Sequence, residues 1–143
     1  MDKYYIDLNV IDLISEKHAK LRKKVRKSWN EQGGDNIGDT ESYVLALLER
    51  KNMTISEISR QIEISRQGTH KCCHSLMDRG YIMVIDSEIN SRDKVLRLTD
   101  KGLEFCKESL KLKEKLEIEI KESIGEENFK IIKECFGKVW LKN

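Results

Sequence analysis

The stretch "TISEISRQIEISRQGTHKCCHSLMDRG", residues 54–80, decides the fold of this chain. Thr54 followed three residues later by Glu57 is typical of a capping box, in which each side chain accepts a hydrogen bond from a free backbone N–H group. A short helix is predicted after this start. Ile64 and Ser65 then end that helix and begin another, which closes at Gly80. The stretch therefore predicts two consecutive helices joined by a tight turn.

The period of the hydrophobic pattern changes after this pair of helices. "YIMVID" (81–86) is rich in β-forming residues, "SEINSRD" (87–93) is polar and turn-like, and "KVLRLT" (94–99) alternates apolar and polar side chains. Two such strands around a charged tip predict a β-hairpin. Two short helices followed by a hairpin are the order of elements in a winged helix-turn-helix.

Longer helices are predicted on both sides of this central unit, over residues 8–31 and over residues 100–142 with a break at Gly125. Apolar residues recur at nearly helical spacing in the first segment, at Ile14, Leu21, Val25 and Trp29. His18 lies in the same stripe, as a partly buried or interface histidine. These stripes carry more apolar surface than a small central core could cover, which favours pairing with a second copy. Packing within one chain is the alternative.

The glycine-rich loop 33–39 connects the first helix to the next one. Thr40 is the expected N-cap of that next helix. Its buried side is expected to comprise Tyr43, Val44, Leu47 and Leu48. The last helix is expected to continue to the end of the chain, with Phe129, Ile132, Phe136 and Trp140 on one side.

The composition is that of one folded domain, residues 1–143. The chain is 38% hydrophobic and contains no proline, which favours long uninterrupted helices. No apolar run approaches the roughly 18 residues of a membrane span, and the start lacks a signal-peptide pattern, so we expect a cytoplasmic protein with no membrane contact. Residues 50–102 carry ten Lys or Arg against seven Asp or Glu, so the positive excess lies where a polyanion would bind.

The sequence "HKCCH" (70–74) looks like a metal or redox cluster. Projection at about 100° per residue places one group of side chains together on the expected inner face of the helix: Thr69, Cys72, Cys73 and Leu76. Gln67, His70, Lys71 and His74 fall on the other face. Structural zinc takes four ligands, and this arrangement does not gather them, so no metal and no cofactor are expected. Two alternatives stay open: an ion held weakly by the two histidines, and a redox switch formed by the cysteines.

The outer face has the chemistry to contact DNA. Gln can bond an adenine edge, Arg or Lys can engage guanine or phosphate, and an N-cap Ser can reach a phosphate together with the free N–H groups of the helix. An arginine at the hairpin tip suits a narrow minor groove, although an exposed solvated turn is the alternative there. The predicted DNA-contacting residues are Ser65, Arg66, Gln67, His70, Lys71, His74, Asn90, Arg92 and Lys94.

The segments "YVLALLERKNMTISEISRQIEISRQGTHKCCHSLMDRGYI" and "DSEINSRDKVLRLTDKG" resemble the MarR-type transcriptional regulators, above all at "LMDRG" (76–80) and "LTDKG" (98–102). Arg92 stands seven residues before Thr99, as the wing arginine of that family does. The resemblance implies that residues 65–79 are a recognition helix and 81–99 a winged hairpin, within a DNA-binding unit at 40–99. It also implies that residues 8–31 and 100–142 are dimerisation helices.

Two departures from the family pattern have consequences. The family often places Asp two residues before the wing arginine, whereas this chain has Asn90, which brings no charge to brace the arginine. Members of the family that sense peroxide use a cysteine in the first helix, and residues 1–71 contain none. That mechanism is therefore not carried over to this chain.

The sequence thus predicts a mainly α fold with a small β-hairpin wing, a winged helix-turn-helix flanked by N- and C-terminal dimerisation helices. The expected function is that of a homodimeric, sequence-specific transcriptional regulator, a repressor relieved by a small-molecule effector and bound to a pseudo-palindromic site in double-stranded DNA. The alternatives are a metal- or thiol-responsive variant of the same regulator, and a winged-helix module that docks proteins without binding DNA. No HExxH, Walker-type or GxGxxG pattern is present, so an enzyme is not expected.

Overall fold

The computed structural model describes residues 7–85 and 94–142. Within them the helices are α2 (Val10–Glu31), α3 (Asp39–Arg50), α4 (Ile55–Ile62), α5 (Arg66–Asp78), α6 (Asp100–Ile124) and α7 (Glu126–Phe136). The strands are β1 (Met53–Thr54), β2 (Ile82–Ile85) and β3 (Val95–Leu98), which form an antiparallel sheet in the order β1-β3-β2. The predicted fold class, mainly α with a hairpin wing, is confirmed.

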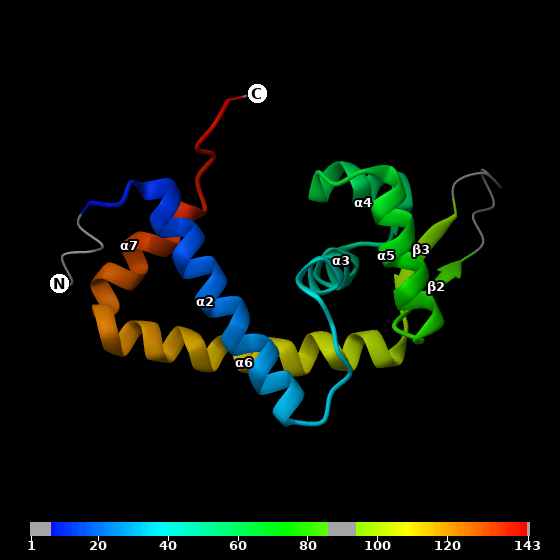
Figure 1. The fold of residues 1–143 in the computed structure, drawn as a ribbon, viewed down its shortest axis with the longest axis horizontal. Coiled ribbons are helices and arrows are strands. Elements are labelled where there is room, and N and C mark those ends of the chain that lie inside the picture. Colours follow the sequence, from blue (N-terminus) through cyan, green and yellow to red (C-terminus); the bar gives the residue numbers. More distant parts are fainter. Residues whose placement is uncertain (1–6, 86–93, 143) are drawn as a thin grey trace.

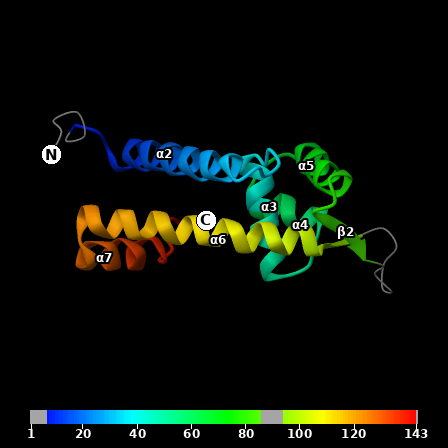
Figure 2. The same cartoon turned by 90° about the horizontal axis from the view of Figure 1, so that it is seen from below.

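Helix α6 runs along the length of the molecule and connects its two ends (Figure 1). Helices α3, α4 and α5 and the sheet gather at the start of α6, whereas α7 folds back at its far end. Helix α2 packs against α6 and lies alongside it in the second view (Figure 2). None of the described helices combines the length and the apolar content that a membrane crossing requires.

Side-chain caps define where the helices begin. The Thr54 hydroxyl accepts a hydrogen bond from the Glu57 N–H at 3.1 Å, and the Glu57 carboxylate accepts from the Thr54 N–H at 3.4 Å, which is the predicted capping box. The Ser65 hydroxyl accepts from the Gly68 N–H at 3.0 Å and starts α5. Each such cap satisfies a backbone donor that the helix itself leaves free.

Helix α3 differs from the prediction in its start and in its buried face. It begins at Asp39 with Gly38 as N-cap, so Thr40 lies inside the first turn, and Glu41 accepts a hydrogen bond from the Gly38 N–H at 3.2 Å. Tyr43 was expected to be buried but is 42% exposed, whereas Leu45 is fully buried. Helix α3 contacts α4, α5, α6 and β3, and its buried arc among these partners includes Leu45 instead of Tyr43.

The C-terminal helix is shorter than predicted. Helix α7 ends at Phe136, and residues 137–142 are not helical. The Trp140 indole N–H donates to the Cys135 carbonyl at 2.6 Å, and its ring lies 4.9 Å from that of Phe136. The indole therefore folds back onto the end of the helix instead of extending it.

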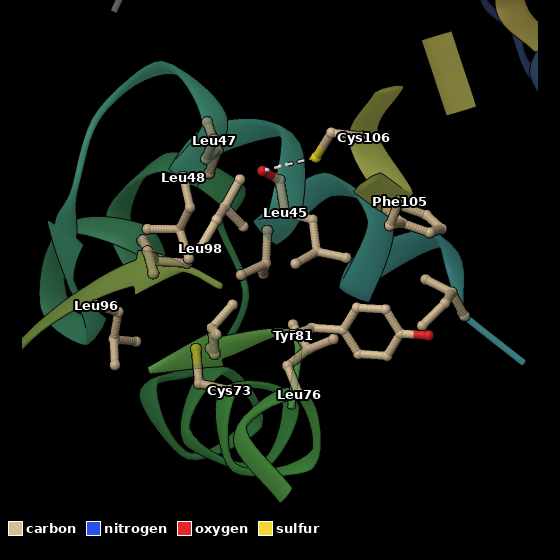
Figure 3. Packing of buried hydrophobic residues seen from close by; sticks show 14 residues of the cluster. Leu45, Leu47, Leu48, Cys73, Leu76, Tyr81, Leu96, Leu98, Phe105 and Cys106 are labelled. Atoms are coloured by element: carbon tan, nitrogen blue, oxygen red, sulfur yellow. Dashed lines mark hydrogen bonds between the residues drawn. The ribbon is translucent and has the colours of Figure 1, made fainter. Parts of the chain in front are cut away.

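The core lies where α3, α5, α6 and the sheet meet (Figure 3). Its fully buried side chains include Leu45, Leu76 and Leu96, one each from α3, α5 and β3. Tyr81 and Phe105 pack edge-to-face with 6.1 Å between ring centroids, and Trp29 of α2 meets Phe105 in the same way at 4.9 Å. The aromatic contacts join α2 to the winged unit.

A close backbone approach fixes the start of α6 against the hairpin. A Cβ atom on Gly102 would stand 2.2 Å from the Tyr81 carbonyl oxygen, a distance that no side chain tolerates. The Thr99 hydroxyl donates to the Gly80 carbonyl at 2.6 Å and accepts from the Gly102 N–H at 3.2 Å. Glycine is required at 102 because the backbone carbonyl of Tyr81 occupies the space of a side chain.

Gly102→Ala should therefore destabilise the protein, because the added methyl group forces backbone apart; overpacking of this kind costs about 1–3 kcal/mol. Urea denaturation followed by circular dichroism measures the change. Gly137→Ala is the matched control, since its Cβ would meet only ordinary contacts of 3.4 and 3.5 Å. Equal stability of the two variants would contradict the packing argument.

Candidate nucleic-acid interface

Helix α5 divides into an inner and an outer face, as the helical projection predicts. Thr69, Cys73 and Leu76 are fully buried, and Cys72 is half-buried. The Thr69 hydroxyl donates to the Ser65 carbonyl at 3.0 Å, so this buried polar group is satisfied within the helix. The two neighbouring thiols therefore contribute to packing against α3 and the sheet.

The polar residues of the outer face are accessible. The exposed members of this face are Ser65, Arg66, Gln67, Lys71 and His74, and His70 is half-buried. Lys94, the first described residue after the hairpin tip, is also exposed. Asn90 and Arg92 lie outside the described residues, so their predicted roles stay predictions.

A groove of about 420 Å³ separates the outer face of α5 from the sheet. Arg66, His70 and His74 line it from α5, and Lys94 lines it from the wing. Gln67 and Lys71 are exposed beside the groove and do not line it. The structure thus brings four of the predicted residues together around one hollow.

The start of α4 contributes to the same groove, which the sequence reasoning missed. The Arg66 guanidinium donates to the Ser56 hydroxyl at 3.2 Å, and Ser56 and Thr54 both line the groove. This hydrogen bond links the two helices of the helix-turn-helix across their outer side. No local signal pointed to this bond, because the turn between the helices joins the end of α4, and not its start, to the N-terminus of α5.

The two histidines of the groove lie one helical turn apart. Their ring centroids are 6.2 Å apart, with 24° between the ring planes. Cys73 is fully buried on the opposite face and so does not join them. Over residues 7–85 and 94–142, no group of three or more His, Cys, Asp or Glu side chains is placed to hold a metal ion.

The thiols of the inner face are poorly suited to redox sensing. Burial raises the pKa of Cys73 to about 11 and, with the neighbouring Cys73 thiol as a further cause, the pKa of Cys72 to about 11. Burial likewise raises the pKa of Cys106 to about 11. Because the thiolate is the reactive form, these three cysteines are unreactive at neutral pH.

The charged residues of the two family-like motifs hold the end of α5 in place. The Arg79 guanidinium donates to the Asn36 carbonyl at 2.8 Å and forms an ion pair with Glu41 of α3. The Lys101 ammonium donates to the Arg79 carbonyl at 2.8 Å and lies over the Tyr81 ring at 4.4 Å. Sequence reasoning recognised these motifs without assigning them this structural role.

Asp35 in the connecting loop completes this cluster. Its carboxylate accepts a hydrogen bond from the Tyr81 hydroxyl at 2.6 Å and pairs with Lys101 at 3.2 Å. The hydrogen bond from Tyr81, followed by the contact with Lys101, lowers the pKa of Asp35. Burial and the same hydrogen bond raise the pKa of Tyr81 to about 12, so the hydroxyl keeps its proton and its bond at neutral pH.

Comparison with known proteins gives matches both in sequence and in fold. Residues 36–102 match the family model described as the sugar-specific transcriptional regulator TrmB. No curated protein matches the chain by sequence. The fold is similar to that of the reduced form of MarR from E. coli, with a TM-score of 0.78 and 15% identity over 94% of this chain and 98% of that one.

Two further solved structures are similar over nearly the whole chain. A MarR transcriptional regulator from Methanosarcina mazei Go1 has a TM-score of 0.74 and 20% identity, covering 96% of this chain and 88% of that one. The transcriptional regulator BldR from Sulfolobus solfataricus has a TM-score of 0.70 and 13% identity, covering 97% and 100%. The family model and both of these structures are described as transcriptional regulators. Residues 36–102 are thus similar to a family of transcriptional regulators, and the whole chain has the fold of the MarR-type winged-helix structures.

Proposed function

We propose that this chain is a homodimeric, sequence-specific regulator that represses transcription until a small ligand releases it from DNA. The observation that carries the proposal is the accessible polar face of α5 beside a groove lined by Arg66 and Lys94. The apolar face of the same helix is sealed in the core, so the polar face is presented in a fixed orientation.

The groups on this face match the chemistry of a duplex. Gln67 can make two hydrogen bonds to an adenine edge, while Arg66 and Lys71 can engage guanine or phosphate. Ser65 and the free N–H groups at the start of α5 can bind a phosphate. In a two-fold dimer the two α5 helices would enter successive major grooves about one helical turn apart, which requires an inverted repeat.

The surface for a second copy lies at the other end of the molecule. Exposed apolar side chains on α2, α6, α7 and the segment after it include Val10, Ile11, Ile118, Ile131, Ile132, Phe136, Val139, Trp140 and Leu141. An apolar groove of about 400 Å³ between α2, α6 and α7 adjoins them. An apolar groove lined by three helices, each of which also carries exposed apolar side chains, favours a protein interface.

A small cavity between α2, α3 and α6 supports the ligand step. It measures about 20 Å³, which is room for one water molecule, and Arg22 and Arg26 of α2 line it. Ser109 also lines it, and its buried hydroxyl has no hydrogen-bond partner among the described residues. Asp39 lines the cavity as well and pairs with Arg26 at 2.6 Å. A larger ligand would have to move α2 away from α3, which would change the distance between the two recognition helices of a dimer.

Selection from random duplex DNA should enrich an inverted repeat with two matching half-sites. Arg66→Ala and Lys71→Ala should each weaken binding to the selected duplex, and the loss of a phosphate contact should reduce the slope of log K against log[salt] by about 1. Fluorescence anisotropy at several salt concentrations measures both quantities.

The matched control is Lys130→Ala, which removes one exposed charge from α7, far from α5 in Figure 1. It should leave both affinity and salt slope unchanged. A protein-docking module would instead show weak binding to all duplexes, with no enriched repeat and no effect of Arg66→Ala, and that result would refute the proposal.

Phe136→Glu should convert the dimer to a monomer, because it places a charge in the middle of the proposed interface. The side chain is 57% exposed, so the fold of each chain should survive. Light scattering coupled to size exclusion measures the mass. Leu103→Glu, at a residue 51% exposed on α6 outside the groove, is the control and should stay dimeric. A monomeric wild-type protein would overturn the dimer.

Iodoacetamide at neutral pH should alkylate Cys135, which is exposed, well before the three cysteines whose pKa is raised to about 11. A thiol with that pKa is ionised to the order of one part in several thousand at pH 7.5. Mass spectrometry of peptides after timed quenching measures the order. Rapid modification of Cys72 or Cys73 in the folded protein would support the thiol-responsive alternative.

A further inference from the structure

The pair of histidines in the groove lies where a DNA backbone or base edge would approach. His70 and His74 stack with their ring centroids 6.2 Å apart, and both line the hollow between α5 and the wing. Histidine is the side chain whose charge ordinarily changes between about pH 5 and 8.

The other charged groups around the pair are mostly positive. Arg66 lies one turn before His70 on the same helix, and Lys94 faces the pair from the wing. Asp78, one turn after His74, is the acidic residue of the groove, and α4 contributes only uncharged side chains there. Among the described residues that line the groove, protonation of both rings would thus gather four cations and one carboxylate, and the cations repel one another in the free protein.

A polyanion removes this repulsion. Phosphate oxygens, or the N7 and O6 acceptors of guanine, would accept hydrogen bonds from protonated imidazoles and neutralise their charge. Binding of DNA then favours protonation, and by reciprocity protonation favours binding of DNA. A neutral imidazole offers only one donor and adds no charge to the contact.

We propose that His70 and His74 are proton-linked contacts, so that the affinity of the protein for its DNA site rises as pH falls through the range in which histidine titrates. This inference rests on the proposed DNA-binding function and adds a regulation of the same face. Each proton taken up on binding raises the association constant by up to about tenfold per unit of pH decrease. Two histidines in each protomer can contribute.

The third histidine of the chain tests whether the linkage belongs to α5 or to the proposed dimer surface. It contains three histidines, and the third, His18, lies on α2 in the groove between α2, α6 and α7. The buried cysteines, with pKa values raised to about 11, keep their protons throughout the neutral range. A pH effect near neutrality can therefore be assigned by substituting histidines alone.

The experiment measures affinity for the selected duplex at constant ionic strength between about pH 6 and 8. Wild-type protein and His18→Gln should bind more tightly at lower pH, by up to about tenfold per pH unit for each linked proton. His70→Gln/His74→Gln should lose the increase in affinity between pH 8 and pH 6, so the ratio of its affinities at the two pH values should be close to one. A merely structural role of the pair would weaken binding equally at both values.

Two results would overturn the inference while leaving DNA binding intact: a wild-type affinity that does not rise as pH falls, or the same pH slope in the double variant. Failure of the proposed function has a different signature, because no inverted repeat would then be enriched and the wild type would bind no duplex selectively at any pH. Circular dichroism of each variant at both ends of the range confirms that the fold is kept.

Discussion

The approach of the Gly102 backbone to the Tyr81 carbonyl is the constraint on which the rest of the structure depends. It sets the first turn of α6 against the residue that follows α5, and the Thr99 hydroxyl joins the two through its bond to the Gly80 carbonyl at 2.6 Å. Helix α5 and strand β2 are thus attached to one end of a long, continuous helix. The orientation of the polar face of α5 follows from this attachment.

The charged residues around this junction orient it more than they stabilise it. Lys101 and Asp35 are about half exposed, and ion pairs of that kind contribute roughly 0–1 kcal/mol each. Tyr81 is only 2% exposed, so most of the stabilisation comes from burying its ring beside Phe105. The ionic contacts then select one arrangement of the loop before α3, because Asp35 has to meet both the Tyr81 hydroxyl and Lys101.

Local signals in the sequence were sufficient to predict helices α4 and α5. Thr54 and Ser65 cap their own helices, and a projection of α5 placed Cys73 inside because that helix has one buried side. Features that depend on distant partners were missed. Strand β1 exists only because Met53 pairs with Leu96, more than forty residues away, and the buried arc of α3 among α4, α5, α6 and β3 includes Leu45 instead of Tyr43.

The candidate site could be predicted to a similar extent. The outward residues of α5 follow from helical periodicity, whereas the groove beside them and the bond from Arg66 to Ser56 need the packing of α4 and the sheet.

Helix α6, with 25 residues, is about 37 Å long. In the proposed dimer, a rotation of about 5° at the far end of α6 would displace its start by about 3 Å over that length. The two half-sites of the proposed DNA site would be about 34 Å apart and would have to be engaged together, so a displacement of this size would weaken binding. The rigidity of the junction at Gly102 is therefore what would allow a small change beside α2 to reach α5 undiminished.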